Sequence, residues 1–178
     1  MTDRPARIAI VTVSDRASRG EYEDKGGPGA EAWLRDVVTS AMQIDRLIIP
    51  DGRDTVATTL RNLADGGADL ILVTGGTGPA PRDLTPEAVA DVMDKELPGF
   101  GEEMRRASLA EVPTAILSRQ TAAIRGHSLI ITIPGKPSAI ATCLNAVFAA
   151  VPYCLDLIGA ARIETDSTRI KAFRPASG

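Results

Sequence analysis

Short apolar runs alternate along this chain with longer stretches in which apolar side chains recur every three or four positions. Runs of the first kind are typical of strands and occur at residues 7–13, 47–49, 70–73, 114–117 and 128–133. Stretches of the second kind predict amphipathic helices at residues 30–42, 55–65, 86–96, 102–109 and 138–151. Strands alternating with helices predict an α/β fold, a three-layer αβα sandwich with a mostly parallel sheet. The short connection from Arg119 to His127 predicts one antiparallel hairpin within that sheet.

The segments between these elements are rich in glycine, proline and polar residues. Residues 19–29 are expected to form a loop, and residues 97–100 to break a helix. Pro152 is expected to kink or split the long apolar helix before it, and Ser138 to cap that helix. The chain after Arg162 is polar and aperiodic, which predicts a poorly ordered tail.

A turn with three glycines in four positions, residues 75–78, follows the apolar run 70–73 and is called the glycine turn below. Glycine lacks a Cβ, so backbone N–H groups in such a turn can approach a ligand closely. Thr85 and Pro86 then predict a helix start, with Thr85 as N-cap. Exposed N–H groups beside a helix start favour anions. Neither the Walker A nor the G-x-G-x-x-G pattern is matched, and glycines that serve packing alone remain the alternative.

Polar residues also follow the other predicted strands, at Ser14-Asp15-Arg16, at Asp51 and at Gly135-Lys136-Pro137-Ser138. If these strands are parallel, all of their carboxyl ends lie at one edge of the sheet, where open α/β sheets bind ligands. Each residue has a structural alternative, because Asp51 lies in a Pro-Asp-Gly turn and Asp83 can simply favour a helix N-terminus.

At this edge of the sheet, groups that attract phosphate would lie beside groups that repel it. Glycine-turn amides and Lys136 attract phosphate, whereas Asp51 and Asp83 repel it. A divalent cation that bridges carboxylates and phosphates removes this conflict, and Mg²⁺ is held in this way. The combination indicates phosphoryl or nucleotidyl transfer.

Composition excludes several other classes of protein. The 178 residues are expected to form one domain, with a formal net charge of −3 and 3% aromatic residues, which argues against nucleic-acid binding. No stretch of the sequence resembles a membrane span or a signal peptide, so a cytoplasmic location is expected. Cys143 and Cys154 are expected as buried free thiols. With His127 as the only histidine, neither a His/Cys metal site nor a Ser-His-Asp triad is expected.

Several segments, taken together and in order, resemble the molybdopterin-binding family, whose domain also occurs in gephyrin. These segments are Thr74–Gly78, Arg82-Asp83 with Thr85–Ala88, Pro98–Glu102 and Pro134–Pro137. Three further segments are similar to the Mog-type molybdopterin adenylyltransferases: Ser14–Ser18, Asp24-Lys25-Gly26 and Val112–Arg119. The resemblance covers about residues 7–159 and implies a domain at residues 1–160 followed by a polar C-terminal tail at residues 161–178.

The resemblance implies Mg²⁺-dependent transfer of AMP from ATP to the terminal phosphate of molybdopterin, with release of pyrophosphate. It implies Asp51 and Asp83 as the catalytic, metal-binding acids. It further implies cofactor-binding roles for Ser14, Asp15, Gly75, Gly76, Thr77, Gly78, Gly135, Lys136 and Ser138. A homotrimer and a downstream molybdenum-inserting partner are also implied.

Two other functions remain open at the level of sequence. The same fold can serve as a non-catalytic molybdopterin carrier or scaffold, although a passive binder has no evident need for both Asp51 and Asp83. Another enzyme on this fold could hydrolyse a nucleotide or pyridine-nucleotide derivative. The region between Ile140 and Tyr153 is shorter than expected for Mog-type proteins, which bears on oligomer contacts more than on catalysis.

Overall fold

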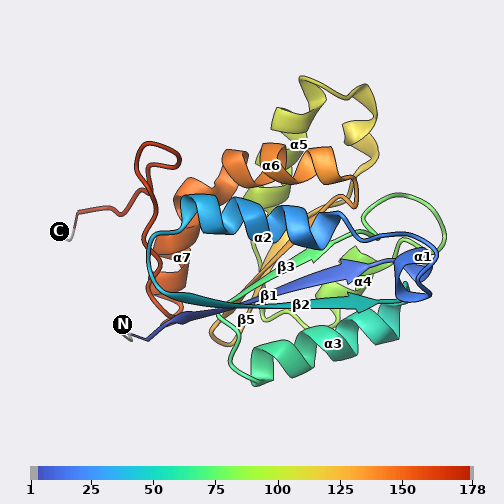
Figure 1. The fold of residues 1–178 in the computed structure, drawn as a ribbon, viewed down its shortest axis with the longest axis horizontal. Coiled ribbons are helices and arrows are strands. Elements are labelled where there is room, and N and C mark those ends of the chain that lie inside the picture. The colour runs from blue at the N-terminus through green and yellow to red at the C-terminus, as the bar shows by residue number, and fades with distance from the viewer. Residues whose placement is uncertain (1–3, 177–178) are drawn as a thin grey trace.

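The computed structural model describes residues 4–176, and they form one sheet flanked by helices. The strands are β1 (Ala6–Val13), β2 (Met42–Ile49), β3 (Leu70–Thr74), β4 (Lys95–Glu96), β5 (Ala122–Arg125) and β6 (Ser128–Ile133), in the order β2-β1-β3-β6-β5-β4. The four strands β2, β1, β3 and β6 are parallel, and β5 pairs antiparallel with both β6 and β4. Figure 1 shows the arrowheads of β1, β2 and β3 pointing to the same side of the molecule, where α1 lies. The mostly parallel sheet with one antiparallel hairpin is therefore confirmed.

Helices cover both faces of this sheet, which makes the three predicted layers (Figure 1). The helices are α1 (Asp15–Ser18), α2 (Gly26–Val37), α3 (Arg53–Asp65), α4 (Thr85–Ala90), α5 (Pro98–Leu109), α6 (Pro137–Val147) and α7 (Val151–Leu157). Two short 3-10 helices, η1 (Pro113–Leu117) and η2 (Phe148–Ala150), complete the described part. Along β1, Ile8 and Ile10 pack with α2 and α6, whereas Ala9 and Val11 pack with α3 and α4. Both faces are buried, and for this reason the central strands are continuously apolar.

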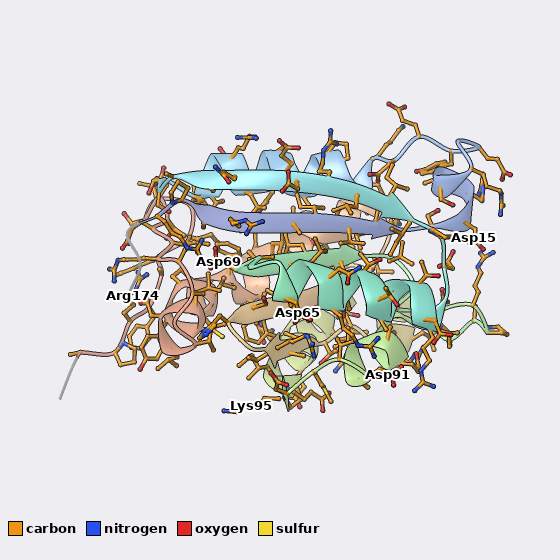
Figure 2. The ribbon with its side chains drawn as sticks, turned by 90° about the horizontal axis from the view of Figure 1, so that it is seen from below. Asp15, Asp65, Asp69, Asp91, Lys95 and Arg174 are labelled. Carbon is orange, nitrogen blue, oxygen red and sulfur yellow. The ribbon has the colours of Figure 1, made fainter. Side chains whose placement is uncertain are left out.

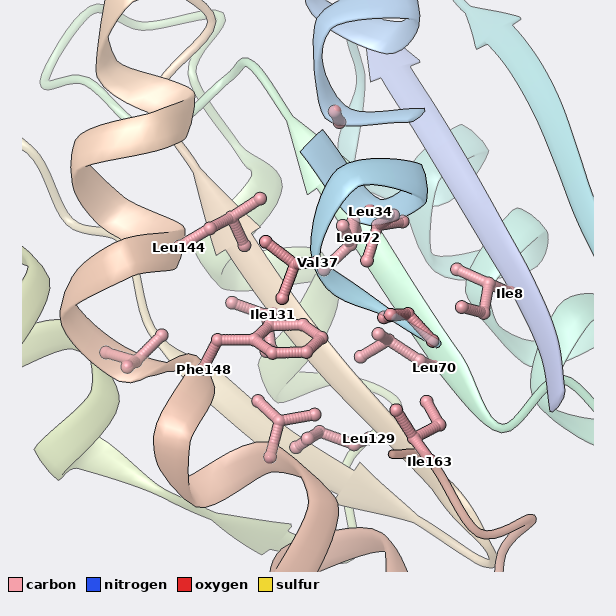
Figure 3. Close-up of a cluster of buried hydrophobic side chains, with 14 of the residues drawn as sticks. Ile8, Leu34, Val37, Leu70, Leu72, Leu129, Ile131, Leu144, Phe148 and Ile163 are labelled. Carbon is pink, nitrogen blue, oxygen red and sulfur yellow. The ribbon is translucent and has the colours of Figure 1, made fainter. Parts of the chain in front are cut away.

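The core on the α2 and α6 side centres on Phe148, which is fully buried (Figure 3). The rings of Trp33 and Phe148 meet edge to face with their centroids 4.8 Å apart. Leu34 from α2, Leu144 from α6 and strand side chains such as Ile131 surround Phe148. Pro152 splits the last helical stretch, as expected, because α6, η2 and α7 follow one another there.

The expectation of a poorly ordered tail after Arg162 is wrong for its described residues. Ile163 and Ile170 are buried in the same core, and Figure 3 shows Ile163 close to Leu70 and Leu129. The backbone N–H of Asp166 donates to the carbonyl of Val37 over 2.8 Å. Two isolated isoleucines in a polar segment carry no periodicity, so the pattern could not reveal this packing. The division at residue 160 stays a prediction, and residues 177 and 178 lie outside the described part.

The predicted strand at residues 114–117 is also wrong. Pro113 begins the 3-10 helix η1 at this place, with Ile116 68% and Leu117 53% exposed. The first strand of the hairpin is instead β5. A short apolar run does not distinguish a strand from a helical turn, and here it does not even face the core.

Several boundaries also differ from the sequence prediction. The helix expected to reach residue 42 ends at Val37, and β2 begins at Met42. Because β2 is an edge strand with mixed burial, its first half has no continuous apolar run from which a strand could be predicted. Gly26 and Gly27, expected in a loop, begin α2, because Asp24 accepts hydrogen bonds from both of their N–H groups. Pro98 begins α5 rather than breaking a helix, and α4 ends early, at Ala90.

One helical run in the described chain, Pro137–Leu157, is long and apolar enough to cross a membrane, judged by length and composition alone. Core helices of water-soluble proteins pass the same test. The run is broken into α6, η2 and α7, and its apolar side chains Leu144, Phe148 and Leu155 are fully buried in the core. The run is therefore a core element of this fold.

Candidate functional site

The loops that follow β1, β2, β3 and β6 enclose a cavity of about 450 Å³, called the main cavity. It lies at the carboxyl ends of the parallel strands, the edge at which open α/β sheets bind ligands. Figure 2 labels Asp15 at this end and Asp69 at the opposite end of the strands. The predicted site residues that line the main cavity are Ser14, Asp15, Asp51, Gly75, Gly76, Thr77, Gly78, Asp83 and Gly135. The structure thus brings both predicted acids and the glycine turn to one cavity.

Asp15 and Asp51 hold each other in place through reciprocal hydrogen bonds. The N–H of Asp15 donates to Oδ2 of Asp51 over 2.9 Å, and the N–H of Asp51 donates to Oδ1 of Asp15 over 3.0 Å. These bonds join the ends of β1 and β2. They also fix one carboxylate oxygen of Asp51, while its Oδ1 accepts no hydrogen bond from a described residue. Asp51 can therefore present an oriented oxygen to a ligand in the main cavity.

Asp83 lies in the loop that follows the glycine turn, and its carboxylate packs against that turn. Oδ2 of Asp83 accepts a hydrogen bond from the N–H of Ala80 over 3.1 Å. A Cβ on Gly78 would stand only 2.7 Å from the same oxygen. The position of the Asp83 carboxylate therefore depends on glycine at residue 78.

The glycine turn packs closely against neighbouring segments, and three of its backbone N–H groups donate to no described residue. Gly75 and Gly76 have φ of +103° and +66°, and a Cβ on either would come within 2.3 Å of a protein oxygen, on Val13 and Thr85 respectively. Packing thus accounts for these two glycines. The N–H groups of Gly76, Thr77 and Gly78, however, donate to no described residue. Successive free N–H groups of this kind form an anion-binding concavity.

Thr85 does not cap α4 as predicted. Its buried hydroxyl donates to the carbonyl of Gly75 over 2.9 Å, and Leu84 holds the N-cap position without a side-chain bond. The hydroxyl therefore fixes the glycine turn instead of the helix end. Thr77 is similarly turned away from solvent, because its hydroxyl pairs with that of Ser118 at 3.2 Å.

Lys136 and Ser138 are not brought into the main cavity. Both are exposed and line a smaller neighbouring cavity of about 190 Å³. Thr114, Ser118 and Pro134 lie between the two cavities and line both. Ser138 does not cap α6 either: Lys136 is the N-cap, without a side-chain bond, and Pro137 opens the helix. The strand pattern located this loop correctly but not the direction of its side chains.

Sequence reasoning did not assign several other residues that line the main cavity. Asp24 accepts hydrogen bonds from the Thr12 hydroxyl and, as described above, from the start of α2. The guanidinium of Arg16 lies over the ring of Tyr22, 5.6 Å from its centroid, at the same cavity. The Asp24-Lys25-Gly26 segment carried a family resemblance, but its pattern gave no sign that the carboxylate faces a cavity.

The charges that line the main cavity favour a cation. Four carboxylates (Asp15, Asp24, Asp51 and Asp83) stand against two guanidinium groups (Arg16 and Arg82). Among the described residues no group of three or more His, Cys, Asp or Glu side chains could hold a metal by itself. Mg²⁺ needs no such group, since it binds through one or two carboxylates together with substrate phosphates and water. The oxygen donors of Asp51 and Asp83 fit this mode.

Comparisons with known proteins agree with this geometry. A model of the probable molybdopterin binding domain matches residues 9–153. The chain is 47% identical over 184 aligned positions to the molybdopterin adenylyltransferase of Haemophilus influenzae, covering 96% of this chain and 93% of that protein.

Two solved structures share the fold. The Mog protein of molybdopterin biosynthesis from Mycobacterium ulcerans has a TM-score of 0.80 and 34% identity, covering 86% of this chain and 99% of that one. The molybdopterin biosynthesis enzyme MoaB from Thermus thermophilus has a TM-score of 0.78 and 40% identity, covering 86% and 96%. Because this family model matches residues 9–153, more than half of the chain, the chain belongs to the molybdopterin-binding domain family.

Proposed function

We propose that this protein is a molybdopterin adenylyltransferase of molybdenum cofactor biosynthesis. It transfers AMP from ATP to the terminal phosphate of molybdopterin and releases pyrophosphate. The observation that carries the proposal is the meeting of Asp51, Asp83 and three free backbone N–H groups in one cavity. The 47% identical relative, which is named for this activity and matches nearly end to end, supports the choice of substrates.

The reaction is a displacement at phosphorus. An oxygen of the terminal phosphate of molybdopterin attacks the α-phosphorus of ATP, and the bond from that phosphorus to the bridging oxygen of the β-phosphate breaks. Mg²⁺, when bound, would offset negative charge on the attacking and leaving oxygens. Asp51 and Asp83 would hold this ion, and the free N–H groups of residues 76–78 would bind and orient phosphate oxygens. Such orientation brings the two substrates to in-line geometry, which supplies much of the rate in phosphoryl chemistry.

Ser14, Asp15 and Gly135 line the main cavity as well, and we propose that they complete the substrate site. Lys136 and Ser138 line the neighbouring cavity, so any contact they make with substrate involves a group that extends beyond the main cavity.

The proposal is tested with purified protein, molybdopterin, Mg²⁺ and ATP labelled at the α-phosphate. The expected result is label in a pterin product and one pyrophosphate per product, both dependent on molybdopterin. Release of pyrophosphate without labelled pterin would indicate nucleotide hydrolysis. Tight molybdopterin binding without any turnover of ATP would indicate a carrier, and either result would refute the proposal.

We further expect a cytoplasmic homotrimer that delivers its product to a molybdenum-inserting enzyme. Eight large apolar side chains of the described residues are exposed, and four of them, Ile116, Leu117, Leu157 and Phe173, are more than half exposed. Sedimentation equilibrium of the purified chain tests the trimer, for which a mass of three times 18.7 kDa is expected.

A further inference from the structure

Arg119 connects both ends of the loop that carries Asp83 with the start of α4, although it does not line the main cavity. Its Nε donates to the carbonyl of Gly78 over 3.1 Å, and its Nη2 donates to the carbonyl of Asp83 over 2.5 Å. Nη1 and Nη2 also pair with the carboxylate of Glu87 in the first turn of α4. These side-chain contacts of Arg119 are called the Arg119 clamp.

The Arg119 clamp closes the loop at both of its ends. The chain bends and turns over residues 78–82, so Gly78 and Asp83 stand at the two ends of this stretch. Glu87 lies in the first turn of α4, the helix that follows. One rigid guanidinium reaches all three because its N–H donors are arranged in a fixed fork. The hydrogen bond from Arg119 lowers the pKa of Glu87, so this carboxylate is ionised at neutral pH and the ion pair persists there.

The clamp contributes little to global stability. The side chains of Arg119 and Glu87 are 39% and 33% exposed, and half-exposed ion pairs of this kind are weak. Its contacts are local, because they join the carbonyls of Gly78 and Asp83 to the first turn of α4.

We propose that Arg119 is a positioning residue for adenylyl transfer: it holds Asp83 where that carboxylate can bind the metal against the phosphates. This inference rests on the proposed function, because it assumes that Asp83 acts in the reaction. Arg119 does not line the main cavity, so in this proposal it acts through the loop and not by direct contact with the phosphates.

The first test compares Arg119→Met with Arg53→Met as matched control. Arg53 also forms a bidentate ion pair with the same helix, to Asp91 at the C-cap of α4, and neither residue lines the main cavity. Both variants are expected to have the same melting temperature. We expect Arg119→Met to lower kcat about tenfold to a hundredfold, as a misplacement of about 1 Å does, and Arg53→Met to leave it unchanged. Arg119→Lys should stay impaired, because one ammonium cannot reach three acceptors; full rescue by lysine would refute the clamp.

The second test measures hydrogen exchange of the Ala80 and Asp83 amides, which are bonded within the loop. Faster exchange of both in Arg119→Met, but not in Arg53→Met, is expected; unchanged exchange would overturn the inference. This measurement needs no substrate, so it stands even if wild-type protein forms no adenylylated pterin and the proposed function fails.

The third test is a double-mutant cycle. If Arg119 acts through Asp83, then Arg119→Met should lower kcat no further in an Asp83→Asn background. A full multiplicative loss in the double variant would show that Arg119 acts independently of Asp83, contrary to the proposal.

Discussion

Gly78→Ala isolates the placement of the Asp83 carboxylate from the rest of the site. The new methyl group would stand 2.7 Å from Oδ2 of Asp83, whereas ordinary van der Waals contact begins at 3.4 Å, so the oxygen must move by about 0.7 Å. Because this oxygen ends a flexible side chain, it can yield and the fold is retained. Gly78 does not have positive φ, so alanine adds no backbone strain, and the N–H of residue 78 is kept.

Gly78→Ala is expected to lower kcat and to leave the free energy of unfolding almost unchanged. A displacement of 0.7 Å stretches the bond from Ala80 and shifts the proposed metal ligand. Misplacement on the order of 1 Å lowers rates by about a hundredfold, so we expect kcat to fall about tenfold to a hundredfold, or about 1.4 to 2.7 kcal/mol. The KM for ATP should change little, since the amide donors remain.

The assay is pyrophosphate release under saturating substrates, with urea denaturation as the measure of folding. Gly99→Ala is the control, because a Cβ on Gly99 meets nothing within 4 Å. We expect Gly78→Ala to unfold within about 1 kcal/mol of wild type. Wild-type kcat in Gly78→Ala would show that the position of the Asp83 carboxylate does not limit the reaction.

Asp51→Asn keeps the shape of the side chain but removes its charge, so kcat should fall at least about a hundredfold at an unchanged melting temperature, and near-normal turnover would exclude Asp51 as a metal ligand. Gly75→Ala places a Cβ 2.3 Å from the carbonyl of Val13 at φ +103°, and should lower the free energy of unfolding by about 3 kcal/mol in urea denaturation; a loss under about 1 kcal/mol would contradict this. Burial raises the pKa of Asp69, but hydrogen bonds from Arg4 and two backbone amides outweigh burial and hold it below its usual value. The stability that Asp69 contributes is therefore present above its unfolded pKa of about 3.9 and is lost as pH falls through the lower folded pKa; in Asp69→Asn this acid-induced loss, followed by circular dichroism, should be smaller.

Much of the site could be predicted from the sequence because its positions are set by strand ends. Four apolar runs end in polar residues, and parallel pairing alone brings those ends to one edge. Asp51 lies close to the end of β2 and the glycine turn directly follows β3, so parallel pairing brings both to this edge, and the loop that carries Asp83 continues from that turn. Lys136 and Ser138 follow β6 in the same way, but side-chain direction within a loop is not encoded in strand order, and both line the neighbouring cavity.

The sequence by itself therefore determined the layered α/β fold, the parallel core of the sheet and the edge where the acids meet. These features arise from local periodicity, since burial on both faces of a strand leaves a continuous apolar run. Only the tertiary structure decided that Thr85 fixes the glycine turn, that Ile163 joins the core and that Arg119 clamps the loop of Asp83. Each of these is a contact between segments far apart in the chain or a choice of side-chain direction. Such contacts form only when the packed elements bring their partners within reach, and no local pattern records them.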